Sequence, residues 1–175
     1  MPRIPNTHGG GALTNAHGLL FEQTTSLNAA LINNGYSIKS HGKVCDSEGN
    51  VLGYSKSKKK FLHFLEKHGA DLTVNSDELR PDDAFININN STVYIIEKKF
   101  QSCRGSVDEK LQTCLYKKKQ YNKLVSQLGY EIEYIYVLND WFYQPKYKDV
   151  LEFIEEIGCH YFFKELPIHF LGLWE

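Results

Sequence analysis

The chain has 175 residues, of which 42% are apolar and 23% charged, and its formal net charge is −1. This length suits one domain with a single core, and the composition is that of an ordinary globular protein. No apolar run approaches the ~20 residues that cross a bilayer, and the N-terminus carries no apolar signal segment. We therefore expect a cytoplasmic protein that does not bind membranes.

The spacing of cysteine and histidine argues against a zinc site. A structural zinc site needs closely spaced ligand pairs, and no CxxC pair occurs here. His63 and His68 lie five residues apart, which is not a metal-binding spacing on a helix. We read the four cysteines as reduced, intracellular thiols.

Charge is distributed unevenly along the chain. The segment from Lys98 to Lys123 holds eight basic and two acidic residues, a balance of +6. The segment from Leu124 to Glu175 holds nine acidic residues and three lysines, a balance of −6. This asymmetry indicates a basic face that can bind phosphates and an acidic face turned away from them. Alternatively, Lys117-Lys118-Lys119 only solvate a helix.

We take residues 1–175 as a single domain. Its first half is predicted to be helical and then weakly β. Residues 1–13 are rich in glycine and proline and predict an irregular arm. Thr14 or Asn15 can cap a helix that runs to about Asn33, where Asn34-Gly35 would end it. Residues 36–56 predict short strands with a turn near 48–50, and 58–67 a brief basic helix.

The second half gives clearer patterns. Two β-rich runs, 84–88 and 92–97, flank Asn89-Asn90-Ser91 and predict a tight hairpin. Ser106 and Glu109 form a capping-box pattern before a long helix that Gly129 would end. A strand over 131–138, a helix over about 146–157 and a short strand over 160–163 follow. We therefore expect an α/β (α+β) domain, with a mixed central sheet flanked by helices.

The hairpin geometry brings three charged residues together. With a loop at Asn89-Asn90, Asp82 falls opposite Glu97; with a loop at Asn90-Ser91, it falls opposite Lys99. Directly opposed residues share a face, and Glu97 and Lys99 share one by alternation. A three-residue loop would bring Asp83 to that face instead. We favour Asp82.

This set of residues fits metal-dependent chemistry on a phosphodiester. Two carboxylates can anchor Mg²⁺, which takes oxygen ligands and keeps several waters. A lysine beside them can position or deprotonate a water and stabilise negative charge. The apolar run from Val93 to Ile96 predicts a strand covered on both sides, so Glu97 marks where the sheet opens to solvent. The alternative is a surface patch of salt bridges.

The motif Asp82…Glu97-x-Lys99, across a hairpin and followed by a helix and a strand, resembles that of the PD-(D/E)xK nuclease superfamily. The chain looks closest to type II restriction endonucleases, and the resemblance covers about residues 8–30 and 80–140. It also takes in the segments Gly9-Gly10-Gly11-Ala12-x-Thr14-Asn15, Gly18-Leu19-Leu20-Phe21-Glu22 and Gly105-Ser106-Val107-Asp108-Glu109-Lys110.

The resemblance implies a ββαβ nuclease core in which Asp82 and Glu97 bind Mg²⁺, with Mn²⁺ able to substitute, while Lys99 assists the attacking water. In some similar enzymes a glutamate of the first helix joins the metal site, and Glu22 matches that role; it is otherwise an ordinary exposed glutamate. The implied partners are double-stranded DNA, a second copy of the chain in a homodimer, and a cognate DNA methyltransferase in a prokaryotic or viral host.

Further contacts to DNA are expected from polar and basic side chains near the motif. Gln101 continues the alternation from Lys99 and would line the same cleft, unless it is merely a polar residue at a strand end. Lys118 either extends to the surface or reaches DNA phosphates. The complete set of expected DNA-binding residues is Gln101, Arg104, Lys117, Lys118, Lys58 and Lys59.

We therefore expect a Mg²⁺-dependent, sequence-specific endonuclease that cuts double-stranded DNA. One alternative keeps the fold and changes the substrate to a mismatch, a junction or a nicked strand. Another is a non-catalytic DNA-binding subunit with a vestigial acidic site. The base sequence read by the protein does not follow from one amino-acid sequence, because it depends on which side chains reach the groove edges.

Overall fold

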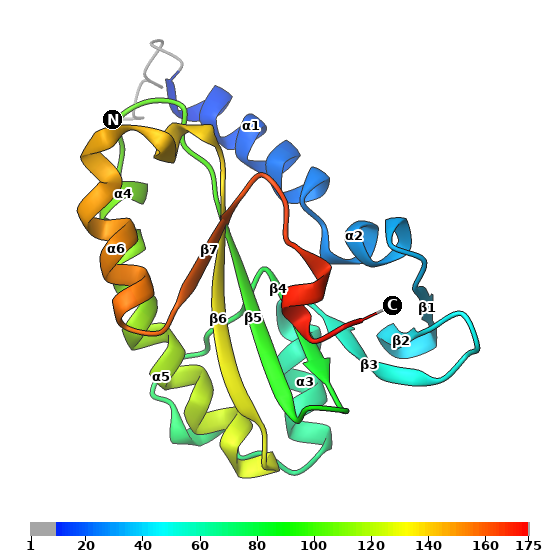
Figure 1. Cartoon of the computed structure of the whole chain (residues 1–175). Helices are drawn as coiled ribbons and strands as arrows, with labels where there is room; N and C mark the ends of the chain where they lie inside the picture. Colours follow the sequence, from blue (N-terminus) through cyan, green and yellow to red (C-terminus); the bar gives the residue numbers. More distant parts are fainter. Residues whose placement is uncertain (1–9, 175) are drawn as a thin grey trace, which may run out of the picture.

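A seven-stranded mixed sheet organises the computed structural model, which describes residues 10–174 and their side chains from His17 onward (Figure 1). The strands lie in the sheet in chain order. They are β1 Ser37–Lys39, β2 Lys43–Cys45, β3 Val51–Lys56, β4 Asp83–Asn87, β5 Thr92–Lys99, β6 Glu131–Leu138 and β7 His160–Phe163.

The pairing changes direction at β5. Strands β1 to β5 are joined antiparallel, whereas β5, β6 and β7 run parallel. A parallel neighbour requires a long crossover connection, and the helical run between β5 and β6 provides it. The prediction of a mixed sheet flanked by helices is therefore confirmed.

Six α-helices and several 3₁₀ turns surround the sheet in the described part of the chain. The α-helices are α1 Gly10–Thr24, α2 Leu27–Asn33, α3 Lys59–Lys67, α4 Val107–Lys110, α5 Cys114–Val125 and α6 Lys148–Glu156. The 3₁₀ turns are η1 Ser40–Gly42, η2 Leu72–Val74, η3 Leu111–Thr113, η4 Ser126–Leu128, η5 Asp140–Tyr143, η6 Pro145–Tyr147 and η7 Ile168–Leu171.

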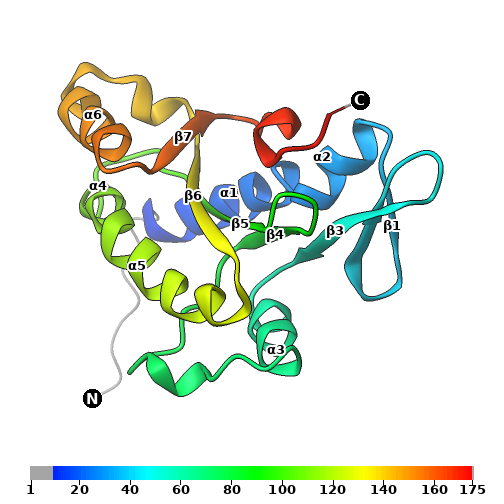
Figure 2. The same cartoon turned by 60° about the horizontal axis from the view of Figure 1, so that its bottom comes forward.

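Each side of the sheet has its own apolar cluster, because alternate strand residues point to opposite faces. One cluster lies on the side that we call the α5 face, where strand residues pack with α3, α5 and α6. The β4 and β5 residues in it are Ala84, Ile86, Val93 and Ile95. On the α2 face, strand residues pack with α2 and the C-terminal segment; those from β4 and β5 are Phe85, Tyr94 and Ile96. Figure 2 shows α3 and α5 on one side of the central strands and α2 with the C-terminal turn on the other.

The predicted first helix is wrong at its start and in its middle. Helix α1 begins at Gly10, within the segment expected to be an irregular arm, while residues 1–9 of that arm lie outside the described part of the chain. Glycine is a poor helix former but is not excluded from a helix. The helical run then breaks between Thr24 and Leu27, where the Thr25 hydroxyl donates to the Phe21 carbonyl at 2.6 Å. Beyond it, the Leu27 N–H donates to the Asp83 carboxylate and not to a carbonyl of the preceding turn, so α2 starts as a separate helix.

The long helix after the motif is confirmed, with a difference at its start. A helical run from α4 through η3 and α5 to η4 covers 107–128, and Gly129, with φ of 77°, ends it. Ser106 does precede the helix, but its side chain makes no capping hydrogen bond. The predicted capping box is therefore wrong, because the backbone of Ser106 is itself helical (φ −71°, ψ −3°) and not extended as a capping residue requires.

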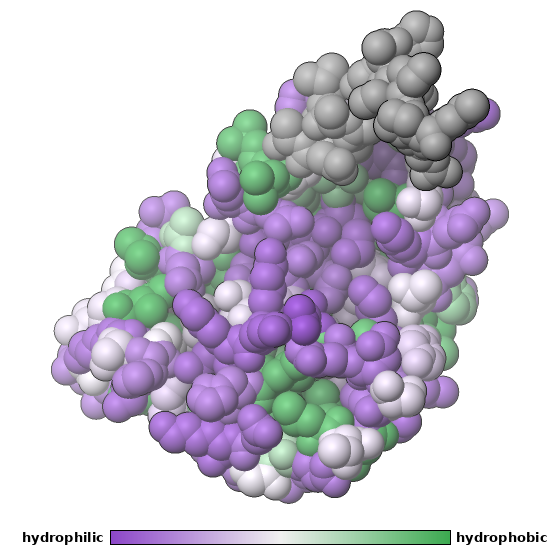
Figure 3. Space-filling model, turned by 180° about the vertical axis from the view of Figure 1, so that it is seen from behind, coloured by the Kyte–Doolittle hydropathy of each residue, from purple (hydrophilic) through white to green (hydrophobic). Residues whose placement is uncertain are grey.

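The surface opposite the view of Figure 1 is mainly hydrophilic, with an apolar area below its centre (Figure 3). Within 10–174, no helix combines the length and apolar character needed to cross a membrane.

Candidate active site

The β4–β5 hairpin fixes which acid faces which. Asn87 pairs with Thr92 and Asp83 pairs with Ile96, so the same register places Asp82 opposite Glu97. The loop has four residues, Ile88–Ser91, and its register matches that of the predicted Asn89-Asn90 loop. The backbone N–H of Lys98 donates to the Asp82 carboxylate at 2.8 Å, which anchors Asp82 just beyond the end of β4.

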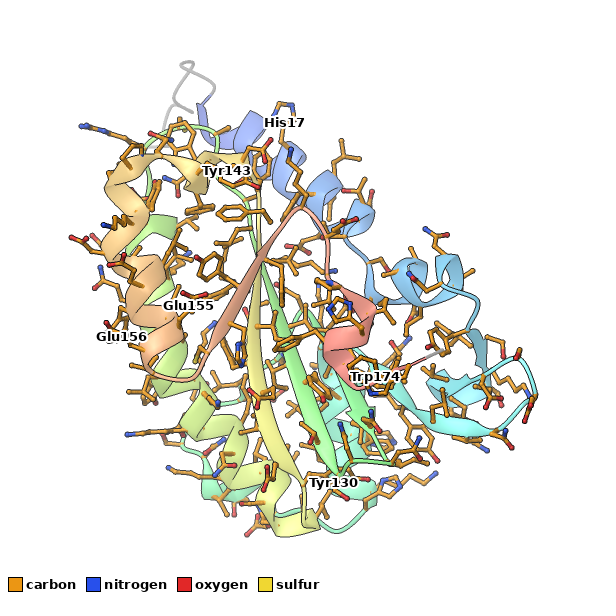
Figure 4. The ribbon with its side chains drawn as sticks, viewed as in Figure 1. His17, Tyr130, Tyr143, Glu155, Glu156 and Trp174 are labelled. Atoms are coloured by element: carbon orange, nitrogen blue, oxygen red, sulfur yellow. The ribbon has the colours of Figure 1, made fainter. Side chains whose placement is uncertain are left out.

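Asp82, Glu97 and Lys99 share the α5 face of the sheet. Asp82 is two residues before Ala84, and Glu97 is two residues after Ile95, and both of these apolar side chains belong to the cluster on that face. In Figure 4, Tyr130 marks the end of the sheet where β6 begins, and Tyr143 and His17 mark the opposite end, where β5 and β6 finish. Glu97 and Lys99 belong to the last residues of β5 and so lie toward that second end.

The Glu97 carboxylate is buried and bound by two ammonium groups. Its side chain is 7% exposed. Lys99 Nζ lies 2.9 Å from Glu97 Oε2 and also donates to the Lys98 carbonyl at 3.3 Å. Lys117 Nζ, from α5, lies 3.4 Å from the same Oε2 atom. Two cations on one oxygen compensate a charge that would otherwise be costly to bury.

Asp83, the alternative acid, belongs to the other face. Its carboxylate accepts from Lys98 Nζ at 2.7 Å and from the backbone N–H of Leu27 at 3.1 Å. Lys98 Nζ in turn donates to the Glu22 carbonyl at 3.0 Å. Asp83 and Lys98 thus connect the hairpin to the junction of α1 and α2, and Asp83 does not share a face with Glu97.

Two buried tyrosines, Tyr121 and Tyr136, lie near the charged groups of the site. Tyr121 of α5 is 1% exposed. Its pKa is raised because burial disfavours the phenolate and because Glu97 and Asp82 add negative charge nearby. The negative charges of Asp82 and Glu97 therefore both lie close enough to the Tyr121 hydroxyl to disfavour its ionisation. Lys99 Nζ also lies 5.8 Å from the centre of the Tyr136 ring.

The donor set of this site fits a hard divalent cation. Asp82 and Glu97 offer carboxylate oxygens, the ligands that Mg²⁺ prefers, and a Mg²⁺ site of one or two carboxylates is completed by water and phosphate. Within the described residues, no three side chains of Asp, Glu, His or Cys gather as a larger metal-binding group. The site is a pair of acids with two lysines.

Glu22 lies at the edge of this region. Its carboxylate is 3.8 Å from Lys58 Nζ, and both side chains are partly exposed. Glu22 also lines a hollow of about 410 Å³ with Lys99 and Lys110, beside the end of β5. Its assignment as a third metal ligand stays a prediction.

Gln101 is buried and paired in this structure, and its contact with DNA stays a prediction. Its side chain is 2% exposed, and its Nε2 atom donates to Asp108 at 2.7 Å. The strand ends at Lys99, so the alternation on which the prediction relied does not continue. Gln101 also exchanges two hydrogen bonds with Asn139, which ties the end of β5 to the segment after β6.

Of the other residues predicted to contact DNA, Lys118 is paired within the protein, whereas Arg104, Lys58 and Lys59 are exposed. Lys118 Nζ donates to the Gly158 carbonyl at 2.5 Å and lies 3.6 Å from Glu133, so it joins α5 to the α6–β7 turn. Arg104 and Lys59 are exposed, and Lys58 is 63% exposed. Their contacts to DNA stay predictions.

Sequence reasoning placed Lys117 on the DNA-binding face and missed its contact with Glu97. The signal was faint: Lys117 lies three residues after Cys114 and four before Tyr121, both buried, so it shares their side of the helix. The three consecutive lysines indicate either a phosphate-binding face or a solvated helix surface, and neither interpretation includes a contact with Glu97.

In comparisons with protein-family models, with curated proteins and with solved structures, nothing matches this chain. The resemblance to PD-(D/E)xK nucleases therefore rests on the motif and on the elements around it.

Proposed function

We propose that this protein is a metal-dependent endonuclease of the PD-(D/E)xK type, which hydrolyses phosphodiester bonds of double-stranded DNA as type II restriction enzymes do. The observation that carries the proposal is the register of the hairpin, which sets Asp82 opposite Glu97 with Lys99 on the same face. The order β4, β5, helix, β6, with β6 parallel to β5, supports the restriction-endonuclease-like core.

The two carboxylates are the proposed cation ligands. A Mg²⁺ or Mn²⁺ ion bound there would orient and activate a water and neutralise charge that grows on the phosphoryl group. Glu97 is held by its two lysines, and Asp82 by the Lys98 N–H, so both oxygen donors are fixed before substrate arrives. Fixed donors of this kind lose little free energy to reorganisation during the reaction.

Lys99 is the proposed partner of the attacking water. Its side chain is only 14% exposed, and its ammonium group lies within hydrogen-bond distance of Glu97. From this position it can orient a water held at the carboxylates and stabilise the negative charge that develops on the phosphate oxygens.

The test is digestion of plasmid and linear DNA with Mg²⁺ by the purified protein and by two variants, Asp82→Asn and Lys99→Met. We expect the parent to give discrete fragments and each variant to lose at least about 100-fold in cleavage rate. Asp77→Asn and Lys123→Met, which change exposed residues of the same types, are the controls and should cut like the parent.

Several outcomes decide against this proposal or narrow it. Variants that cut as well as the parent would show that the site is wrong. Cleavage restricted to branched or mismatched DNA would favour a structure-specific repair nuclease of the same fold. No Mn²⁺ binding by calorimetry, together with DNA binding that Asp82→Asn leaves intact, would favour a non-catalytic DNA-binding subunit.

A further inference from the structure

We propose that Lys117 is a second ammonium group of the active site, which holds the Glu97 carboxylate and limits how tightly the two acids bind a divalent cation. This inference rests on the proposed function and assigns Lys117 a role different from a contact to the DNA backbone. Lys117 would act through Glu97, so it is a positioning residue.

The geometry singles out Lys117 among the lysines of α5. Its ammonium group lies 3.4 Å from Glu97 Oε2, and its side chain is 27% exposed. Lys118 is committed to Gly158 and Glu133 at the other end of β6. Lys119 and Lys123 are exposed. Among the described lysines of this helix, only Lys117 reaches a carboxylate of the site.

Both lysines bind the same oxygen of Glu97, which means that a cation at that oxygen must share it with them. Lys99 lies closer, at 2.9 Å, and comes from the same strand as Glu97. Lys117 comes from a different element, so its ion pair with Glu97 joins α5 to β5. Removing it would free Glu97 Oε2 from one of its two cations.

The charge balance of the site gives Lys117 a second effect. Asp82 and Glu97 carry two negative charges, and Lys99 and Lys117 carry two positive charges, so the four groups sum to zero. A divalent cation raises the sum to +2. If the bound water has given its proton to the solvent, hydroxide attack on the phosphodiester, which carries one negative charge, would give a transition state of charge −2, and the sum of +2 would match it. Without Lys117 the sum would be +1, and the same transition state would be stabilised less.

Loss of the Lys117 charge should have opposite effects on metal binding and on cleavage. A positive charge beside a ligand oxygen repels an incoming cation. Lys117→Met should therefore bind Mn²⁺ more tightly, while cleavage of DNA should become slower. A merely structural role would weaken both, because a distorted site binds metal less well.

The experiment is calorimetric titration of Mn²⁺, without DNA, into the parent chain, Lys117→Met, Lys117→Arg and the control Lys123→Met. We expect the dissociation constant to fall by about tenfold in Lys117→Met, because this variant removes one positive charge beside the ligand oxygen. Lys117→Arg keeps the charge and Lys123→Met changes an exposed lysine on the same helix, so both should stay within about twofold of the parent. Circular dichroism would confirm that each variant is folded.

A second set of measurements follows the binding and the cleavage of DNA. With saturating Ca²⁺ in place of Mg²⁺, Lys117→Met should bind duplex DNA within about threefold of the parent, with the same salt dependence, while its maximal cleavage rate in Mg²⁺ falls at least about tenfold. Weaker DNA binding with a salt slope reduced by about one would instead identify Lys117 as a phosphate contact and overturn the inference.

Failure of this inference is distinct from failure of the proposed function. If the parent binds Mn²⁺ and cuts DNA while Lys117→Met binds Mn²⁺ no more tightly, the inference is wrong and the nuclease assignment stands. If only Lys117→Met binds Mn²⁺, the inference is supported, because Lys117 then blocks the site. If neither protein binds Mn²⁺, both are wrong.

Discussion

At the scale of single residues, two neighbouring aspartates have different roles because adjacent strand residues point to opposite faces. Asp83 forms a buried ion pair with Lys98, and its side chain is 15% exposed. Asp82 accepts a backbone N–H and faces Glu97. Asp83 therefore joins the hairpin to the junction of α1 and α2, whereas Asp82 is placed to offer its charge to the proposed cation.

This difference predicts a separation of stability from activity. Asp83→Ala should lower the free energy of unfolding by about 3 kcal/mol, because it leaves the ammonium of Lys98 buried without its carboxylate. Lys98→Met should have a similar effect for the converse reason. Asp82→Asn keeps an acceptor for the Lys98 N–H and should change stability by less than about 1 kcal/mol. Urea unfolding followed by circular dichroism measures all three.

A control makes this comparison specific. Asp77→Ala removes an exposed carboxylate and should leave the unfolding midpoint unchanged. If Asp83→Ala were as stable as Asp77→Ala, the buried pair would contribute nothing, and the account of Asp83 as a structural residue would fail.

At the scale of elements, the β4–β5 turn sets the chemistry of the site because it sets the register. Asn87 is fully buried and its Oδ1 accepts from the backbone N–H groups of Asn89 and Asn90 at 2.9 and 3.3 Å. Its Nδ2 donates to the carbonyls of Leu171 and Gly172 at 2.9 and 3.3 Å. One side chain therefore holds the turn and docks the C-terminal segment on it.

Asn87→Ala should destabilise the protein by about 2–3 kcal/mol, since it removes several hydrogen bonds and leaves buried backbone groups without partners. Asn89→Ala is the matched control, because Asn89 is exposed and contributes its backbone N–H to the turn. Denaturant unfolding compares the two. Equal unfolding midpoints would show that the Asn87 bonds do not hold the turn.

The same hairpin shows how much of the site could be predicted from the sequence. Alternation and turn residues gave the two strands and the face shared by Asp82, Glu97 and Lys99, because these depend on neighbours in the chain. The loop length was underestimated, since the Asn87 side chain closes a four-residue turn and its partners Leu171 and Gly172 are 84 and 85 residues away.

Contacts between distant elements were the part that the sequence could not give. The break before α2 depends on the Asp83 carboxylate, which receives the Leu27 N–H from 56 residues away. The burial of Gln101 depends on Asn139 and Asp108. The contact between Lys117 and Glu97 depends on how α5 packs across β5. No local pattern encodes such packing.

At the scale of the whole molecule, the number of proposed sites in one chain determines how both strands of a duplex would be cut. Within residues 10–174, one pair of carboxylates carries the proposed chemistry, and each such site would cut one strand at a time. A duplex presents its two strands in opposite directions, so a symmetric pair of chains would address both. We therefore expect cleavage of both strands to come from a homodimer.

Mixing active and inactive chains tests this expectation. Parent protein should convert supercoiled plasmid largely to linear DNA. If the chains are exchanged with a tenfold excess of Asp82→Asn, most active chains will have an inactive partner, and the main product should become nicked circles. A monomer that cuts the strands in succession would keep the same ratio of linear to nicked product at matched active-chain concentration. Gel electrophoresis of the products, with sedimentation analysis of the exchanged mixture to show that subunits were shared, decides between the two.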